Sequence, residues 1–193
     1  KFTEKFECYS VPRNQVEFHK DTTKILYLIS TVDNYNVLTN SFIDIETNLI
    51  HLMKVLDYCN TSGKQIEFTF VSSWFVYGDT ELPAKETSYC KPKGFYSITK
   101  RTAEQLLESY CKTFDMKYKI VRLANVVGKG DGKVSKKKNA LQYLIEEMIH
   151  DRDINLYNSG NFYRDILHVD DAVDGLKFVM DKGESGEIYN LGS

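Results

Sequence analysis

A tyrosine and a lysine four residues apart have the spacing needed for joint acid–base chemistry. Tyr96 and Lys100 lie near the start of a strongly helical stretch, so their side chains leave the same face of one helical turn. A phenol with a pKa of about 10 is a weak base at neutral pH, and a neighbouring ammonium lowers that pKa by favouring the phenolate. Such a pair can remove a proton from a hydroxyl group and return it.

A serine upstream offers a third group for the same chemistry. The run 66–71 is typical of a buried strand and leads directly into Ser72 and Ser73. At the end of this strand, the Ser73 hydroxyl is a candidate to hydrogen-bond the substrate oxygen that Tyr96 serves, and Ser72 is the alternative. Together with Lys100, these groups suit reversible proton removal from a sugar or alcohol hydroxyl, provided that a hydride acceptor lies alongside.

Alternating strand and helix patterns surround these residues. Apolar runs rich in β-formers predict strands at 24–29, 66–71, 118–123 and 187–191. Apolar residues at helical spacing predict helices at 41–58, 94–114, 140–150 and from Asp170 or Asp171 to about residue 181. This alternation is typical of an α/β fold with a parallel sheet and helices on both faces. Ligands of such sheets bind at the carboxyl ends of the strands, where Ser73, Tyr96 and Asn125 are expected.

The bulk composition restricts the class of protein. A chain of 193 residues is long enough for one substantial hydrophobic core. Its net charge of -2 does not suggest the basic surface that binds nucleic acid. The four cysteines are scattered, so we expect neither a metal site nor a disulfide framework, and free thiols suit a reducing compartment. No apolar run approaches the roughly 20 residues that span a bilayer. We therefore expect a cytoplasmic protein with no nucleic-acid or membrane partner.

The order of several motifs resembles the extended short-chain dehydrogenase/reductase family, in its NAD-dependent nucleotide-sugar epimerase/dehydratase branch. The residues that carry the resemblance run from about residue 25 to the end of the chain: Ser73 with Val76-Tyr77-Gly78, Tyr96 with Lys100, 122–128, 164–171 and 188–192, with Asn48 matching a further family position. Any one match is weak, but five in the right order are strong.

The resemblance implies a role for each candidate residue. Ser73, Tyr96 and Lys100 would be catalytic, and Ser73 would also bind the sugar hydroxyl that is oxidised. The cofactor, NAD or NADP, would contact Tyr96, Lys100 and the pair Ser30 and Thr31, which stand where the family usually has two alanines. Asn125 and Arg164 would bind the diphosphate of a nucleotide-diphosphate sugar, because a guanidinium fork suits phosphate oxygens.

The resemblance also implies that the chain is a partial domain. The family opens with a glycine-rich pyrophosphate-binding turn, and no such turn precedes residue 24. The family also continues beyond Asn190-Leu191-Gly192 into a substrate lobe. We therefore expect residues 1–193 to form part of an NAD(P)-binding Rossmann-type domain that lacks the first glycine-rich βα unit and the C-terminal lobe. The substrate-binding region would begin at about residue 129.

The two residues after Ser73 bear on the reaction type. In the family members that dehydrate nucleotide sugars, the residues at these two positions resemble Asp-Glu. This chain has Trp74 and Phe75 there, which carry no transferable proton. An epimerase is therefore the favoured activity. A 4-ketoreductase or dehydratase of the same family remains an alternative, as does a non-catalytic dinucleotide-binding relative. The family often dimerises, so a homodimer is possible.

Overall fold

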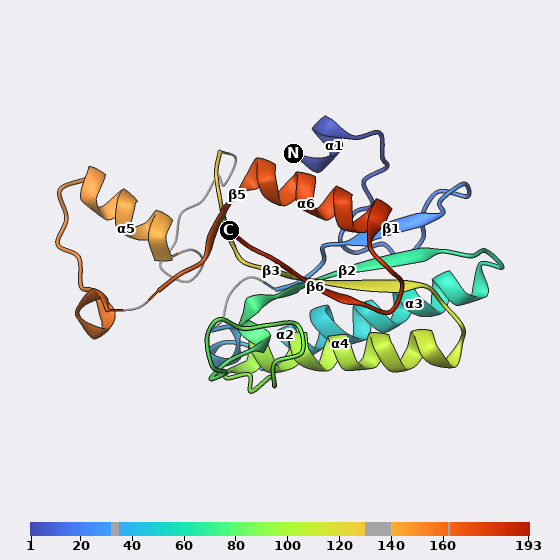
Figure 1. Ribbon diagram of the computed structural model, residues 1–193, viewed down its shortest axis with the longest axis horizontal. Helices are drawn as coiled ribbons and strands as arrows, with labels where there is room; N and C mark the ends of the chain where they lie inside the picture. The colour runs from blue at the N-terminus through green and yellow to red at the C-terminus, as the bar shows by residue number, and fades with distance from the viewer. Residues whose placement is uncertain (32–34, 130–139, 162) are drawn as a thin grey trace.

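A four-stranded parallel sheet forms the centre of the molecule. The structure, a computed structural model, describes residues 1–31, 35–129, 140–161 and 163–193. The strands lie in the order β1-β2-β3-β6 (Figure 1). Their bounds are Lys24–Tyr27 for β1, Glu67–Ser73 for β2, Tyr118–Leu123 for β3 and Ile188–Leu191 for β6. In this register Phe70 of β2 lies between Tyr27 of β1 and Ile120 of β3.

Helices cover both faces of this sheet (Figure 1). The helices α3 and α4 pack on one face, and α6 lies on the other face with the short α1 beside it. Their bounds are Phe2–Lys5 for α1, Ile43–Ile45 for α2, His51–Thr61 for α3, Phe95–Thr113 for α4, Ala140–Ile149 for α5 and Val169–Lys182 for α6. This arrangement confirms the predicted α/β, Rossmann-type fold.

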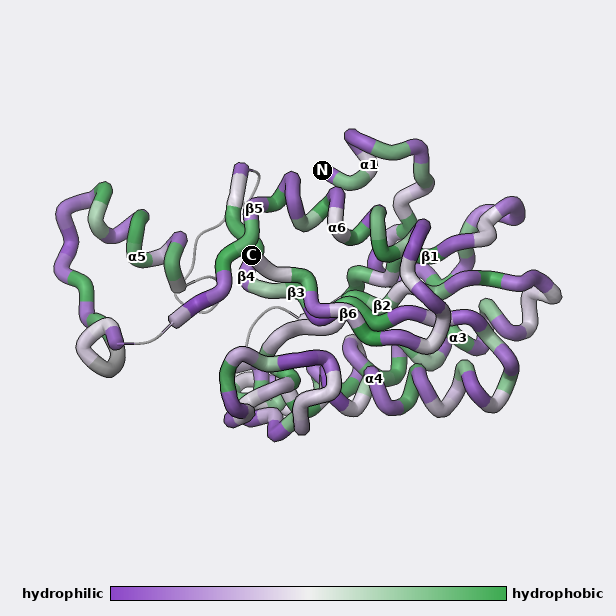
Figure 2. The backbone as a smooth tube through the Cα atoms, viewed as in Figure 1, coloured by the Kyte–Doolittle hydropathy of each residue, from purple (hydrophilic) through white to green (hydrophobic). Residues whose placement is uncertain are grey.

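The core is apolar on both sides of the sheet because helices exclude water from both faces. Hydrophobic residues recur along the central strands (Figure 2), and every residue of β2 from Phe68 to Ser73 is buried. One cluster, which includes Leu52, Phe68 and Leu107, lies between the sheet and the helices α3 and α4. A smaller cluster lies under α6 and includes Val121. Packing on both faces therefore holds the sheet, and with it the ends of its strands, in a fixed position.

A second, two-stranded parallel sheet was not predicted. It pairs β4 (Asn125–Val127) with β5 (Ile166–His168), next to the end of β3. Helix α5 lies away from the central sheet on this side of the molecule (Figure 1). The proposed substrate-binding region, from about residue 129, would begin here, and its first part, residues 130–139, lies outside the described residues.

Several predicted boundaries differ from the structure. The predicted helix 41–58 is divided in the structure into α2, one π-helical turn (Glu46–Ile50) and α3. Strand β1 ends at Tyr27, where its pairing with β2 ends, rather than at residue 29. The N-cap of α6 is His168, whose ring nitrogen accepts a hydrogen bond from the Asp170 backbone N–H at 3.3 Å, and not Asp170 or Asp171. Both aspartates lie instead in the first turn, where negative charge favours the helix dipole.

Candidate active site

The end of β2 and the start of α4 bring a serine and a tyrosine together. Ser73 is the last residue of β2, and its Oγ accepts a hydrogen bond from the Phe75 backbone N–H at 3.3 Å, which caps the 3-10 turn Trp74–Val76. Helix α4 begins after Gly94, which has φ 80°, a backbone conformation that glycine adopts readily. Tyr96 therefore lies in the first turn of α4, and the Ser73 side chain is near enough to its hydroxyl to influence its pKa.

The Ser30 side chain, beyond the end of β1, also influences the pKa of the Tyr96 hydroxyl. Burial raises the pKa of Tyr96 above its ordinary value, and Ser73 and Ser30 oppose this rise. The nearby carboxylate of Asp44 raises it further. The neutral phenol is therefore the favoured form of Tyr96 in this structure.

The structure distinguishes between the two candidate serines. Successive side chains of a strand point to opposite faces of the sheet, so Ser72 and Ser73 cannot both reach Tyr96. Ser73 is the one that lowers the pKa of Tyr96. The buried Oγ of Ser72 has no hydrogen-bond partner in the described part of the chain. Ser73 is therefore the serine that is placed for the proposed chemistry.

Lys100 is buried, and its amine is bonded to the sheet. Its Nζ donates to the backbone carbonyl of Val71 at 2.7 Å and lies 4.1 Å from the centre of the Phe70 ring. Its role beside the Tyr96 phenol stays a prediction. A fully buried ammonium needs an acceptor, and the nearby strand carbonyl supplies one. Burial lowers the pKa of Lys100 to about 7, and Glu104 opposes the change.

Behind Ser30, a polar network joins the end of β1 to the helices below. The Asn48 Oδ1 accepts hydrogen bonds from the Thr31 backbone N–H at 2.9 Å and from Ser30 Oγ at 3.2 Å. The Asn48 Nδ2 donates to Thr31 Oγ1 at 3.0 Å and to Thr99 Oγ1 at 2.9 Å. Thr31 Oγ1 in turn donates to Asp44. Because Thr31 is 4% exposed and its hydroxyl is engaged inside the protein, Ser30 is better placed than Thr31 to contact a cofactor.

Asp44, the carboxylate of this network, was not predicted from the sequence. The only sequence feature that marks it is its position four residues before Asn48, which places both side chains on one helical face. A carboxylate in an amphipathic helix normally faces solvent. Only the structure shows that Asp44 is buried, with 1% of its surface exposed.

The two predicted substrate-binding residues lie at the start of the small second sheet. Asn125 begins β4, and its Nδ2 donates to the backbone carbonyl of Asp165 at 3.0 Å. Arg164 precedes β5, and its guanidinium lies 5.1 Å from the centre of the Trp74 ring. Burial lowers the pKa of Arg164. The parallel pairing of β4 with β5 therefore places Asn125 and the segment that carries Arg164 at the same end of this sheet.

A row of aromatic rings connects Arg164 to the candidate catalytic groups. The rings of Trp74 and Phe75 stack with their centres 4.3 Å apart. Phe75 in turn meets Tyr96 edge to face, with ring centres 5.9 Å apart. An apolar wall of this kind would limit the access of water to the Ser73 and Tyr96 hydroxyls.

A buried ion pair fixes α4 against β3. Arg122 of β3 donates from Nε and NH2 to the two carboxylate oxygens of Glu104, at 3.1 and 2.9 Å. The Tyr77 ring lies 4.7 Å from the guanidinium of Arg122. The pair holds the helix that carries Tyr96 in a fixed position relative to the sheet.

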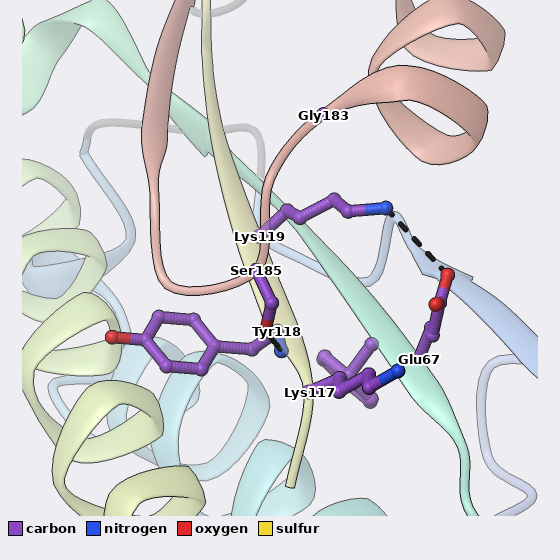
Figure 3. A pocket seen from close by; sticks show the side chains of 7 residues that line it. Glu67, Lys117, Tyr118, Lys119, Gly183 and Ser185 are labelled. Carbon is purple, nitrogen blue, oxygen red and sulfur yellow. Dashed lines mark hydrogen bonds and ion pairs between the residues drawn. The ribbon is translucent and has the colours of Figure 1, made fainter.

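Two surface cavities lie apart from these groups. One, of about 160 Å³, lies at the amino ends of β2 and β3, where Lys119 points toward Glu67 (Figure 3). The other, of about 550 Å³, lies beside α4 and is lined by residues that include Cys90 and Arg101. Neither cavity is lined by Ser73 or Tyr96.

Within the described ranges, no three or more His, Cys, Asp or Glu side chains are grouped so that they could hold a metal ion. None of the helices in that same part of the chain has the length and apolar character needed to cross a bilayer.

The parallel sheet, with Ser73 and Tyr96 at its carboxyl edge, defines a Rossmann-type α/β protein. The chain belongs to the NAD dependent epimerase/dehydratase family, whose model matches residues 13–192. This match confirms the resemblance drawn from the motifs. The family's dependence on NAD agrees with the predicted cofactor. The hydroxyl donors of Ser30 and Tyr96, beyond the ends of β1 and β2, fit the ribose hydroxyls of such a cofactor.

Individual relatives include both dehydratases and epimerases. The chain is 26% identical over 160 residues to a dTDP-D-glucose 4,6-dehydratase of Dictyostelium discoideum, covering 77% of this chain and 36% of that protein. It is 27% identical over 146 residues to an uncharacterized UDP-glucose epimerase, YtcB, of Bacillus subtilis, covering 75% of this chain and 45% of that protein. Among solved structures it is similar to the UDP-glucose 4-epimerase of Thermotoga maritima with UDP-glucose, at a TM-score of 0.78 and 25% identity, covering 88% of this chain and 55% of that one.

Proposed function

We propose that this chain is part of an NAD(P)-dependent nucleotide-sugar epimerase. The observation that supports this most directly is the position of Ser73 at the carboxyl end of β2, where ligands of parallel sheets bind, next to Tyr96 in the first turn of α4, whose ring meets that of Phe75 edge to face. When it is bound, NAD or NADP supplies the acceptor and donor of hydride at the sugar carbon. Tyr96, Lys100 and Ser30 would hold the nicotinamide side of the cofactor.

In this proposal Tyr96 exchanges the proton of a sugar hydroxyl. Ser73 would hydrogen-bond the same oxygen and hold it in place for the transfer. Lys100 would favour the phenolate form of Tyr96 when its own amine is protonated, and its pKa of about 7 places that change in the neutral range. An epimerase needs both directions of the transfer, because the hydroxyl loses its proton in one half-reaction and regains it in the other.

The proposed substrate is a nucleotide-diphosphate sugar. Asn125, at the start of β4, and Arg164, just before β5, would bind the diphosphate, with the sugar extending along Trp74 toward Ser73. The guanidinium offers a fork of N–H donors that matches phosphate oxygens. Relatives whose names include dTDP-D-glucose or UDP-glucose support this substrate class.

A 4-ketoreductase of the same family is the second candidate. One observation favours it: the raised pKa of Tyr96 keeps the hydroxyl protonated, which is the form that donates a proton to a carbonyl oxygen as it is reduced. A dehydratase is less favoured, because Trp74 and Phe75 line the site where an eliminating acid and base would be needed. A non-catalytic relative would have no need of the Tyr96 hydroxyl beside Ser73. A homodimer remains a possible assembly.

Incubating the intact protein with NAD or NADP and a panel of UDP- and dTDP-hexoses tests the proposal. We expect one of these to be converted to an isomer of equal mass, with no net consumption of cofactor. Stoichiometric cofactor consumption would support the ketoreductase instead. A product lighter by one water would overturn both and would require eliminating groups elsewhere in the protein.

A further inference from the structure

The larger of the two surface cavities, beside α4, is not used by the proposed chemistry. It has a volume of about 550 Å³, and none of the residues assigned to the sugar nucleotide or the cofactor lines it. Cavities that hold small ligands in proteins have volumes of roughly 300–1,000 Å³. This cavity therefore has room for a small molecule other than the proposed substrate and cofactor.

Three parts of the fold build this cavity. Its lining residues come from one face of α4, from the loop before α4 and from the central sheet, where Arg122 of β3 and Ile188 of β6 contribute. The loop is held in place by backbone hydrogen bonds. The Lys91 N–H donates to the Tyr77 carbonyl at 2.9 Å, and the Lys85 N–H donates to Ser88 Oγ at 2.9 Å. The walls of the cavity are therefore fixed by the sheet, the helix and an anchored loop.

Two guanidinium groups on this cavity share one carboxylate. Arg122 donates from Nε and NH2 to the two oxygens of Glu104, and Arg101 donates from NH1 to Glu104 Oε2 at 2.7 Å. Among the described residues, the ion pairs of both arginines are with Glu104. Two positive charges beside one negative charge leave an excess of positive charge, and the two like charges repel each other. A second anion in the cavity would offset this excess.

Arg101 is the arginine that can still receive an anion. The Arg122 side chain is 1% exposed, and it also donates from NH1 to the Glu86 backbone carbonyl at 3.2 Å. The Arg101 side chain is 28% exposed, and among the described residues its hydrogen-bond partner is Glu104, through NH1. The other N–H groups of its guanidinium can therefore reach a ligand. Such a fork of donors matches the oxygens of a carboxylate or a phosphate.

The other charged groups on the cavity have partners of their own. Glu108 pairs with Lys112 at 2.6 Å, and the exposed Glu86 accepts a hydrogen bond at Oε1 from the Asn190 backbone N–H at 2.8 Å. The Cys90 thiol, which also lines the cavity, agrees with a positive field there. Burial raises the pKa of Cys90, and the charges of the two arginines oppose this rise more strongly than the charge of Glu104 adds to it.

We propose that the cavity between α4 and the loop before it is a second binding site, which takes a small organic anion whose carboxylate or phosphate group is held by Arg101. Pro92, Ile98 and Ile188 line the same cavity and would contact the apolar body of the ligand. The Thr102 hydroxyl, also on the cavity, is a further hydrogen-bond donor. The site goes beyond the proposed function, because it uses none of the residues assigned to that reaction.

The test is the binding of phenyl phosphate and of benzoate to the intact protein, followed by ligand-detected NMR. All titrations are made in Arg164→Ala, so that the proposed diphosphate site does not contribute. We expect at least one of the two anions to bind saturably, and benzyl alcohol, which has the ring without the charge, not to bind. Adding Arg101→Gln should weaken binding of the anion at least about tenfold. Adding Arg152→Gln, which removes an exposed arginine that pairs with Glu147, should leave binding unchanged.

No saturable binding of either anion, or equal binding in the Arg101→Gln and Arg152→Gln variants, would overturn the inference. If Arg101→Gln does not fold, Thr102→Phe fills the cavity from α4 and keeps both arginines, and we expect it to abolish binding. Ser109→Phe, at an exposed position of α4 that does not line the cavity, is the control. Binding that Thr102→Phe leaves unchanged would also overturn the inference. These titrations need neither sugar nucleotide nor NAD or NADP, so their outcome is independent of the proposed function.

Discussion

The Ser73 side chain is near enough to the Tyr96 hydroxyl to lower its pKa, although Ser73 ends strand β2 and Tyr96 lies in the first turn of helix α4. Neither element could place its residue alone. The strand is fixed by burial on both faces, and the helix is fixed against β3 by the ion pair between Glu104 and Arg122. The relationship therefore depends on the whole sheet rather than on a local motif.

Arg164→Ala should weaken binding of a UDP- or dTDP-sugar at least about tenfold and leave binding of NAD or NADP nearly unchanged. The physical reason is that its proposed partner is the diphosphate of the sugar nucleotide, for which charged hydrogen bonds are strong. Calorimetric titration of the intact protein with each ligand measures this. Arg152→Ala removes an exposed arginine that pairs with Glu147, and it should change neither affinity. Equal loss of both ligands in Arg164→Ala would count against the diphosphate role.

The buried amine of Lys100 predicts a pH dependence of stability. Its pKa is lowered from 10.5 to about 7 in the folded state, so between these values the unfolded chain binds more protons than the folded one. The free energy of unfolding contributed by Lys100 should therefore rise with pH from about 7 to about 10. Urea unfolding of the parent and of Lys100→Met across that range measures the difference between them.

The free energy of unfolding of the parent minus that of Lys100→Met should grow steadily as the pH rises from about 7 to about 10. Lys112 is the control, because it is exposed and its hydrogen bond to Glu108 raises its pKa instead. The same comparison with Lys112→Met should give no such increase. A pH-independent difference for Lys100→Met would mean that the amine is not desolvated as described.

The ion pair between Glu104 and Arg122 should be costly to break from one side. Both side chains are almost completely buried, so Glu104→Ala leaves a guanidinium without its carboxylate and should cost about 3–5 kcal/mol of unfolding free energy. Glu108→Ala, four residues further along α4, removes a carboxylate that pairs with Lys112 at the surface. It should cost about 0.5 kcal/mol or less. Comparable losses in the two variants, measured by urea unfolding, would contradict this view of the pair.

Gly78 should not tolerate a side chain. It has φ 58°, and a Cβ built there would lie 1.7 Å from the backbone carbonyl oxygen of Lys91. Gly78→Ala should therefore lower the free energy of unfolding by about 2 kcal/mol or more. Gly63 also has a positive φ, 70°, but nothing lies within 4 Å of its Cβ position. Gly63→Ala, which adds only the backbone strain, should cost clearly less in the same thermal or urea unfolding experiment.

The sequence predicted the parts of the fold that depend on periodic burial. The strand 118–123 was placed with its observed bounds, and the helix 94–114 differs from α4 by one residue at each end. The proximity of Ser73 and Tyr96 also followed, because strand ends and helix starts meet at one edge of a parallel sheet. The β4–β5 pair was missed, since strands of three residues are too short to show a pattern.

The direction of individual polar side chains could not be predicted. The spacing of Tyr96 and Lys100 gives a shared helical face, but the Lys100 amine turns to the Val71 carbonyl because that acceptor lies within reach in the folded chain. The contact of Thr31 with the cofactor stays a prediction, and the hydrogen bonds of its hydroxyl with Asp44 and Asn48 could not be predicted from the sequence. Such choices depend on which partners the fold brings close, and these are distant in sequence.

The most direct test of the central claim is the turnover of Tyr96→Phe in the intact protein with NAD or NADP and the nucleotide sugar identified in the panel. The variant removes one oxygen and keeps the ring that meets Phe75 edge to face. We predict turnover at least about 100-fold slower than that of the parent, as for loss of a general acid and base, with binding of cofactor and sugar nearly unchanged. Turnover within a few-fold of the parent would contradict the account, because the proton would then be transferred by another group.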